Sequence, residues 1–343
     1  MSDQTPILDI KNLSVHFRIY GGTLKVLDGV NFHVFPGEKV GLVGETGCGK
    51  TTTMKAILRV LPIPPALIPN GEILFKGQDV LKMNQRKLLE MRGQGISMIF
   101  QDPTAALNPV FTIGQQLEAV IRHASAHNHR LPRKVIEQQA RLALREVALA
   151  DPDRLLNSYP IQLSGGMRQR VCIGMALSTD PELLIADEPG TALDVTIQDQ
   201  VLRLLQRLVD KKEKSVILIT HTLGIVRQTT DRVYVMYAGN MVEVAPTKRL
   251  FAKPAHPYTQ GLMAAVPRLS GGGISEGIPG RIPSYMNPPV GCRFHTRCPH
   301  AMPVCQRQKP PIFTVDDEAH QVACFLYDEP AKVQAYKQEQ VVV

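Results

Sequence analysis

The stretch that decides the fold of this chain is Gly44-Glu45-Thr46-Gly47-Cys48-Gly49-Lys50-Thr51. It matches the phosphate-loop pattern G-x-x-x-x-G-K-[ST], whose glycines let the backbone turn until successive N–H groups point at one anion. Residues 39–43 before it are typical of a short buried strand, and residues 51–58 after it are typical of a helix. Strand, loop and helix in this order predict an α/β fold with a site for the phosphates of a nucleotide.

The polar residues of this loop suit the chemistry of a bound triphosphate. The helix after the loop adds the positive end of its dipole. Lys50 brings a full positive charge to the β- and γ-phosphates, and the hydroxyl of Thr51 can bind Mg²⁺. The loop therefore predicts a site for a nucleoside triphosphate together with Mg²⁺.

Length and charge set limits on the class of protein. The 343 residues suit about two domains. The net charge is +8, from 39 basic and 31 acidic residues, but the charges are scattered, so charge alone favours neither nucleic acid nor an anionic membrane. No signal peptide is evident, and no apolar run approaches the ~20 residues that span a bilayer. We expect a cytoplasmic protein, in which cysteines are thiols or metal ligands rather than disulfides.

A second block of chemistry begins with a helix start that could bind an anion. Ser164 is a good N-cap, and Gly165 and Gly166 leave backbone N–H groups open to an anion. The helix is predicted to run to about Ser178.

Two carboxylates end the apolar strand that follows. Residues 183–186 are apolar, and Asp187 and Glu188 come directly after them. A carboxylate at the C-terminal end of a strand, downstream of a phosphate loop, is typical of the Mg²⁺ site of a nucleotide hydrolase. Glu188 is then placed to orient or deprotonate water. The next buried strand, residues 215–220, is followed by His221.

Apolar periodicity predicts the other elements of this region. Strands are expected at residues 8–17, 71–77 and 96–100, and helices at residues 82–93, 113–124 and 133–150. Phe17 or Tyr20 could supply an aromatic face for an adenine ring. An ordinary strand aromatic is the alternative for both.

Taken together, the motifs resemble those of the ATP-binding subunits of ABC transporters. Besides the phosphate loop, the matching features are Gln101 after a strand, Leu163-Ser164-Gly165-Gly166, Asp187-Glu188, Asp194 and His221. The Leu-Ser-Gly-Gly element separates ABC ATPases from other phosphate-loop proteins. The resemblance implies a nucleotide-binding domain at residues 1–245, with a RecA-like core, an antiparallel β subdomain and a helical subdomain at about residues 102–178. A small C-terminal domain, residues 246–343, would follow.

Further motifs are similar to those of the oligopeptide/dipeptide importer branch. They are Phe100-Gln101-Asp102-Pro103, Leu107-Asn108-Pro109, Met167-Arg168-Gln169-Arg170 and His256-Pro257-Tyr258-Thr259. The resemblance implies an ATPase that powers the import of di- or oligopeptides. Relatives of this branch carry nickel, opines, glutathione or oligosaccharides, so these solutes stay open. Gly190 and Thr222 depart from the usual Thr and Asp of the family, and neither change removes a catalytic group.

The resemblance also assigns a role to each site residue. The residues that would hold the phosphates are Gly44, Glu45, Thr46, Gly47, Cys48, Gly49, Lys50, Thr51 and Thr52, and Phe17 would stack on adenine. Thr51 and Asp187 would hold Mg²⁺, and Gln101 would sense it while touching the permease. Glu188 would activate the attacking water, and His221 would contact the γ-phosphate.

Each ATP site of this family is completed by a second ATPase subunit. Ser164, Gly165 and Gly166 would cap the ATP of the facing subunit, and Asp194 would lie at the dimer seam. The implied partners are a homologous ATPase, for which we expect a heterodimer, two integral membrane permeases and an extracytoplasmic solute-binding protein. The implied location is the cytoplasmic face of the inner membrane.

A soluble ABC ATPase acting on DNA or ribosomes is the alternative, but only about 60 residues separate Gln101 from Leu163. That leaves room for a compact helical subdomain and no long coiled-coil insertion, so we expect no nucleic acid partner.

Four cysteines near the C-terminus suggest a metal site. They are Cys292, Cys298, Cys305 and Cys324, at intervals of five, six and eighteen residues. The C-x-x-C pairs of zinc ribbons are missing, so the spacing does not favour zinc. Members of the importer branch carry a similar pattern that holds a [4Fe–4S] cluster, and zinc and plain thiols are the alternatives. We expect a structural unit, with ATP binding at Lys50 largely independent of it.

Overall fold

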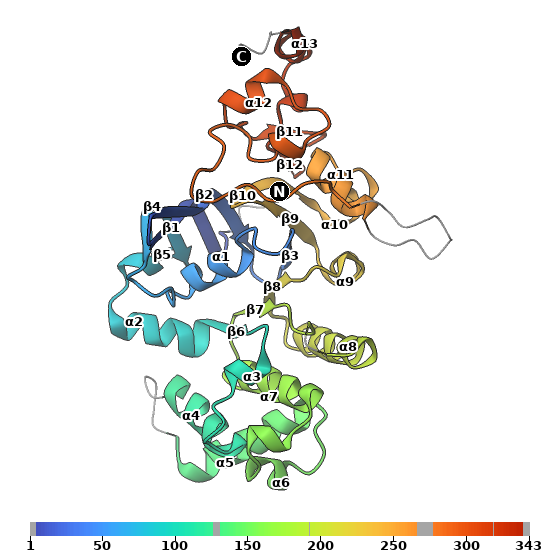
Figure 1. The fold of residues 1–343 in the computed structure, drawn as a ribbon. Coiled ribbons are helices and arrows are strands. Elements are labelled where there is room, and N and C mark those ends of the chain that lie inside the picture. Colours follow the sequence, from blue (N-terminus) through green and yellow to red (C-terminus); the bar gives the residue numbers. More distant parts are fainter. Residues whose placement is uncertain (1–4, 126–130, 192, 266–276, 318, 339–343) are drawn as a thin grey trace. The chain divides into compact units, whose positions relative to one another are not determined.

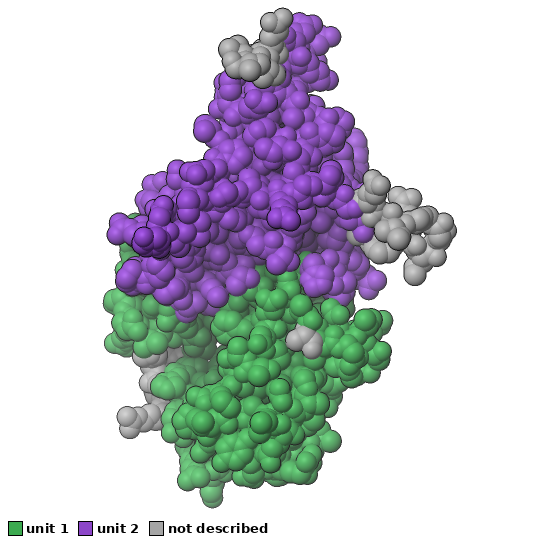
Figure 2. Space-filling view, in the orientation of Figure 1, with its two compact units in different colours: residues 1–7, 34–39, 78–220 green, residues 8–33, 40–77, 221–343 purple. Residues whose placement is uncertain are grey.

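The computed structural model describes residues 5–125, 131–191, 193–265, 277–317 and 319–338. The chain forms two compact units, each built from several segments (Figure 2). Unit 1 contains Met1–Ile7, Val34–Lys39 and Gln78–Thr220, and unit 2 contains Leu8–His33, Val40–Gly77 and His221–Val343. The predicted domain boundary after residue 245 falls inside unit 2 and stays a prediction. Residues 126–130 of the predicted helical subdomain lie outside the described residues.

Three parallel strands lie side by side in unit 1. They are β6 (Ile96–Ile99), β7 (Leu183–Asp187) and β8 (Ser215–Ile219), with β7 in the middle. Every residue of β7 and β8 is buried. Parallel strands covered on both faces are apolar along their whole length, which is the pattern that predicted them.

Helices make up most of the rest of unit 1 (Figure 1). They are α2 (Gln85–Glu90), α3 (Pro103–Ala106), α4 (Ile113–Ser125), α5 (Arg133–Glu146), α6 (Pro152–Leu156), α7 (Gly165–Leu177) and α8 (Val195–Lys211). A short strand, β5 (Gln78–Asp79), and a π-helical stretch, Met91–Gly95, flank α2. The helix predicted at 133–150 ends at Glu146, and Ala148 has a left-handed φ of +55° that a helix does not accommodate. Sequence reasoning did not predict α8.

Unit 2 contains an antiparallel group of three long strands. The strands β2 (Gly22–Val34), β1 (Leu8–Ile19) and β4 (Ala66–Phe75) lie in that order. β4 begins earlier than predicted, because Pro69 does not end it. Pro69 falls where the register against β1 shifts, between the pairs Ser14–Asn70 and His16–Leu67. A bulge is one of the few strand positions that tolerate proline.

A second group of strands in unit 2 joins the phosphate-loop region to the C-terminal segment. Its order is β3 (Lys39–Val43), β9 (Arg232–Tyr237), β10 (Asn240–Pro246), β12 (Gln321–Val322) and β11 (Phe313–Thr314). β3 and β9 are parallel, and β10 pairs antiparallel with both β9 and β12. The helices of this unit are α1 (Lys50–Ile57), α9 (Leu223–Thr229), α10 (Thr247–Ala252), α11 (Pro257–Ala264), α12 (Pro303–Arg307) and α13 (Pro330–Gln338).

An aromatic core connects the same two regions of unit 2. The ring of Tyr237 lies 4.7 Å from the ring of Tyr258 and 5.0 Å from that of Phe294, between centroids. All three side chains are buried, so the turn that carries Phe294 is packed onto β9 rather than hanging free. In the part of the chain that the structure describes, no helix is both long and apolar enough to cross a membrane.

Candidate nucleotide-binding site

The phosphate loop connects β3 to α1, as predicted, and two of its glycines have separate reasons to lack a side chain. A Cβ on Gly44 would lie 2.1 Å from the carbonyl oxygen of Met236 on β9, so close packing forbids it. Gly47 has a φ of +84°, and a Cβ there would meet nothing within 4 Å. Left-handed backbone beside open space is what lets a loop wrap around an anion.

The side chain of Lys50 lies inside this loop. Lys50 is only 6% exposed, and its ammonium donates to the carbonyl oxygens of Gly44, at 2.7 Å, and Glu45, at 3.1 Å. A buried cation needs compensation, and neutral carbonyls supply only part of it. The loop and Lys50 therefore fit a bound polyphosphate. Thr51 and Thr52 follow in the first turn of α1.

Side chains from the C-terminal part of unit 2 hold the first half of the loop. The N–H of Glu45 donates to the hydroxyl of Tyr258 (2.8 Å), and the hydroxyl of Tyr285 donates to the carbonyl of Gly47 (2.7 Å). The carboxylate of Glu45 accepts from both terminal nitrogens of Arg297, at 2.7 and 3.0 Å. Sequence reasoning noted Tyr258 only as part of a family motif and missed Tyr285 and Arg297, because no local pattern links these residues to the loop. The expected independence of ATP binding from the cysteine segment stays a prediction.

The predicted water-activating residue lies at the end of β7 in unit 1. One carboxylate oxygen of Glu188 accepts from the side-chain amide of Gln101 (3.1 Å) and from the hydroxyl of Thr191 (2.8 Å). The backbone of Glu188 has a left-handed φ of +46°, which is uncommon for a residue with a side chain and occurs often at functional sites. Asp187, the last residue of β7, is 2% exposed. The structure thus brings Asp187, Glu188 and Gln101 together.

The predicted anion-binding helix start lies beside the start of α8. The hydroxyl of Ser164 accepts from the N–H of Met167 (3.3 Å), which makes it the N-cap of α7, as predicted. Asp194 caps α8 in the same way. A Cβ on Gly166 would lie 2.7 Å from a methyl carbon of Ile197, so glycine is what lets the two helix starts approach each other.

One departure from the family pattern has a packing reason. A Cβ on Gly190 would lie 2.5 Å from Cγ of Gln198 in α8. The usual threonine would have to displace that side chain. Thr222, the other departure, is the residue before α9.

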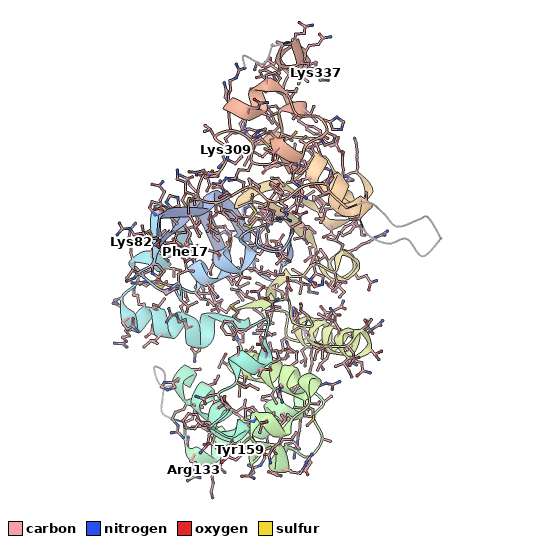
Figure 3. The ribbon with its side chains drawn as sticks, viewed as in Figure 1. Phe17, Lys82, Arg133, Tyr159, Lys309 and Lys337 are labelled. Carbon is pink, nitrogen blue, oxygen red and sulfur yellow. The ribbon has the colours of Figure 1, made fainter. Side chains whose placement is uncertain are left out.

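The remaining predicted site residues lie in unit 2. Phe17 is a half-buried residue of β1, paired with Ala66 of β4 (Figure 3). His221 is exposed and lies just before α9. Each unit thus holds its own set: Phe17, the loop and His221 in unit 2, and Gln101, Ser164–Gly166, Asp187, Glu188 and Asp194 in unit 1.

The four C-terminal cysteines line one small cavity in unit 2. None of the four forms a disulfide. Burial raises the pKa of the Cys292 and Cys324 thiols to about 12 and holds those of Cys298 and Cys305 above the usual range. The neighbouring thiols add to this shift, as expected for groups that lie close together. Among the described residues, no three His, Cys, Asp or Glu side chains are arranged to hold a metal ion.

The chain is similar to known proteins over most of its length. A family model described as ABC transporter matches residues 27–191, and one described as oligopeptide/dipeptide transporter, C-terminal region, matches residues 242–305. The chain is 48% identical over 326 residues to a probable peptide ABC transporter ATP-binding protein, y4tR, of Sinorhizobium fredii, covering 94% of this chain and 96% of that one. It is 46% identical over 328 residues to the dipeptide transport ATP-binding protein DppD of Bacillus subtilis, covering 95% and 96%.

A solved structure shares the fold. The dimeric ATP-binding cassette MJ0796, bound to ADP and phosphate, superposes with a TM-score of 0.62 at 24% identity and covers 70% of this chain and 98% of its own.

The chain has the features of a phosphate-loop ATPase, namely a phosphate loop between a strand and a helix and a second strand followed by carboxylates. The predicted α/β ABC ATPase fold is confirmed. The chain belongs to the family of ABC transporter ATP-binding proteins and, within it, to the oligopeptide/dipeptide transporter branch. Membership implies ATP and Mg²⁺ as its ligands, as predicted.

Proposed function

We propose that this chain is the ATP-hydrolysing subunit of a membrane importer for di- or oligopeptides. The observation that carries the proposal is the match, over nearly the whole length of both chains, to ATP-binding proteins named for peptide and dipeptide transport. It includes the C-terminal region, which is the part described for oligopeptide/dipeptide transporters. The proposal includes the division into a nucleotide-binding domain at residues 1–245 and a C-terminal domain at residues 246–343.

The proposed catalytic roles follow the chemistry of the two sets of residues. Residues 44–52 and the ammonium of Lys50 hold the phosphates, and Phe17 stacks on adenine. Thr51, Asp187 and Gln101 would hold Mg²⁺, which offsets charge on the phosphates.

The carboxylate of Glu188 accepts a proton from the attacking water. Its hydrogen bonds from Gln101 and Thr191 fix the orientation of the base. His221 contacts the γ-phosphate.

A second ATPase subunit completes each site in this proposal. The N-terminus of α7, with Ser164 as its cap, offers N–H groups to the γ-phosphate bound by the partner, and Asp194 lies at the seam. The exposed position of Ser164 and Gly165 supports this role, because neither is covered within its own chain. Contacts that form only with the γ-phosphate would hold the dimer closed. Hydrolysis would remove these contacts and allow the dimer to open.

Exposed apolar side chains in unit 1 support docking to integral membrane permeases. The large apolar residues of unit 1 that remain exposed include Phe100, Val110, Phe111, Tyr159 and Ile161, which are 43–81% exposed. They lie on segments that contact one another, since the N–H of Ile113 donates to the carbonyl of Ser158, and Arg168 donates to both Pro160 and Thr104. Tyr159 is marked in Figure 3. Grouped apolar exposure next to Gln101 is the kind of surface that a protein partner covers.

The partners provide the test of the function. Affinity-tagged protein from the native membrane is expected to copurify with two integral membrane permeases and a second ATPase, and with no nucleic acid. A Phe111→Asp variant should lose the permeases, whereas Lys337→Asp, a charge change on α13 in unit 2, should retain them. Recovery of DNA or ribosomes in place of permeases would favour the soluble alternative and overturn the importer. Because its proposed partners are integral membrane permeases, the proposed location of the chain is the cytoplasmic face of the membrane. An extracytoplasmic binding protein would deliver the peptide.

We further propose that the four cysteines hold a structural [4Fe–4S] cluster. In such a cluster each thiolate binds a different iron, so the sulfur atoms stand farther apart than around one zinc ion. Four cysteines that line one cavity supply the number of ligands that this cluster needs. The local core is small, consisting of Met302, Val304, Cys305 and Phe325, and a metal cluster would add the order that apolar burial cannot supply.

Anaerobically purified protein is expected to be brown, with about four irons and four sulfides per chain. Cys298→Ser should bleach it and make residues 285–325 more sensitive to protease. The matched change Cys172→Ser, in α7, should leave the colour unchanged. Colourless anaerobic protein with one zinc per chain would reject the iron–sulfur cluster and leave a zinc site.

A further inference from the structure

Two arginines lie in the turn between Cys292 and Cys298, and both reach across to the nucleotide-binding part of unit 2. Arg293 donates to the carbonyl oxygens of Lys25 in β2 (3.2 Å) and of Ala238, just after β9. Arg297 donates to the carboxylate of Glu45 in the phosphate loop. The cysteine-bounded turn is therefore bound directly to the ATP site rather than standing apart from it.

Arg297 is held in one geometry by its full set of donors. Besides its two hydrogen bonds to Glu45, it donates to the carbonyls of Pro279 (2.8 Å) and Ile278 (2.9 Å) and to the hydroxyl of Tyr237 (3.3 Å). Its side chain is 5% exposed. A guanidinium has five N–H groups in a rigid fork, and all five directions are used here. Such a fork fixes the orientation of the carboxylate that it binds.

The backbone of the same part of the loop is fixed by two tyrosines. Tyr258 accepts from the N–H of Glu45, and Tyr285 donates to the carbonyl of Gly47. Because a trans peptide is planar, a fixed carbonyl at Gly47 makes the N–H of Cys48 point the opposite way. That N–H donates to the carbonyl of Glu45 within the loop (3.2 Å).

Charge gives the Arg297–Glu45 pair an effect on nucleotide binding. Glu45 places a carboxylate in the loop that receives a triphosphate, and like charges at close range repel strongly where burial limits screening. The Arg297 guanidinium offsets that charge. Without it, the loop would be looser and would also carry an uncompensated negative charge.

We propose that Arg297 is a positioning residue for the phosphate loop, and that through Glu45 it makes the affinity for ATP depend on the order of the Cys292–Cys298 turn. The turn is tight, since the N–H of Arg297 donates to the carbonyl of Phe294 (2.9 Å) and the N–H of Cys298 to that of His295 (3.3 Å). Whatever anchors Cys298 therefore anchors the residue before it. The inference rests on the proposed ATP site at Lys50.

The test measures Mg–ATP binding and steady-state hydrolysis with the full-length chain in its transporter. Arg297→Gln is expected to raise the KM and the dissociation constant for ATP about tenfold while kcat changes less than about twofold, because the chemical groups of unit 1 are untouched. Arg297→Lys keeps the charge without the fork, so its KM and dissociation constant for ATP should lie between those of wild type and Arg297→Gln. Arg281→Gln, an exposed arginine of the same segment, is the matched control and should bind like wild type.

Combining variants separates this role from a general loss of folding. Glu45→Gln removes the carboxylate, so it should restore most of the ATP affinity lost in Arg297→Gln. Cys298→Ser should also weaken ATP binding. The loss of affinity caused by Cys298→Ser should be smaller when Glu45→Gln is present than when Glu45 is intact. A double variant that binds as weakly as Arg297→Gln alone, or an Arg297→Gln protein with wild-type KM, would overturn the proposal. Wild-type protein that fails to bind ATP would instead contradict the proposed function itself.

Discussion

A Glu188→Gln protein should bind ATP with near wild-type affinity and hydrolyse it about 10²- to 10³-fold more slowly. The glutamine carbonyl can still accept from Gln101 and Thr191, so the local geometry is retained while the proposed base is lost. The ATP-bound dimer should then accumulate, because in the proposed cycle closure needs the γ-phosphate and opening needs its removal. Single-turnover hydrolysis and size-exclusion chromatography in Mg–ATP would measure the two effects.

Glu182→Gln is the matched control for this experiment. Glu182 directly precedes β7, at the end opposite Glu188, and it is exposed, so its amide variant should hydrolyse ATP like wild type. Wild-type turnover in the Glu188→Gln transporter would reject Glu188 as the group that activates water.

A Lys50→Ala protein should lose at least about 100-fold in ATP affinity, equivalent to about 2.7 kcal/mol. The ammonium of Lys50 lies inside the loop, and its removal takes away the full positive charge expected at the β- and γ-phosphates. Its hydrogen bonds to the carbonyls of Gly44 and Glu45 are lost as well, so the loop is less ordered before binding. Calorimetric titration with Mg–ATP would measure the loss.

Lys55→Ala provides the comparison for this variant. Lys55 lies on the same helix, in its last turn, and its removal should leave ATP affinity within about twofold of wild type. Thermal unfolding of both variants would show whether either loses structure. Intact affinity in a folded Lys50→Ala protein would contradict the assignment of this loop to ATP.

Local patterns predicted the parts of the fold that depend on short stretches of chain. The strands β3, β7 and β8 were evident as continuous apolar runs, because both of their faces are covered. The helix α8 was missed although Val201, Leu204 and Leu208 recur at helical spacing and are buried. The strand pairing of β10 with β12 carries no such local signal.

The sequence by itself determined the phosphate loop, the cap at Ser164 and the carboxylates at the end of β7, because each is a contiguous motif whose backbone geometry is set by neighbouring residues. Only the tertiary structure decided what surrounds them. Arg297 lies 252 residues from Glu45 in the chain, and its side chain reaches the loop because Phe294 packs against Tyr237 and fixes the turn. Contacts of that kind arise from packing between distant segments, which no local spacing of residue types encodes.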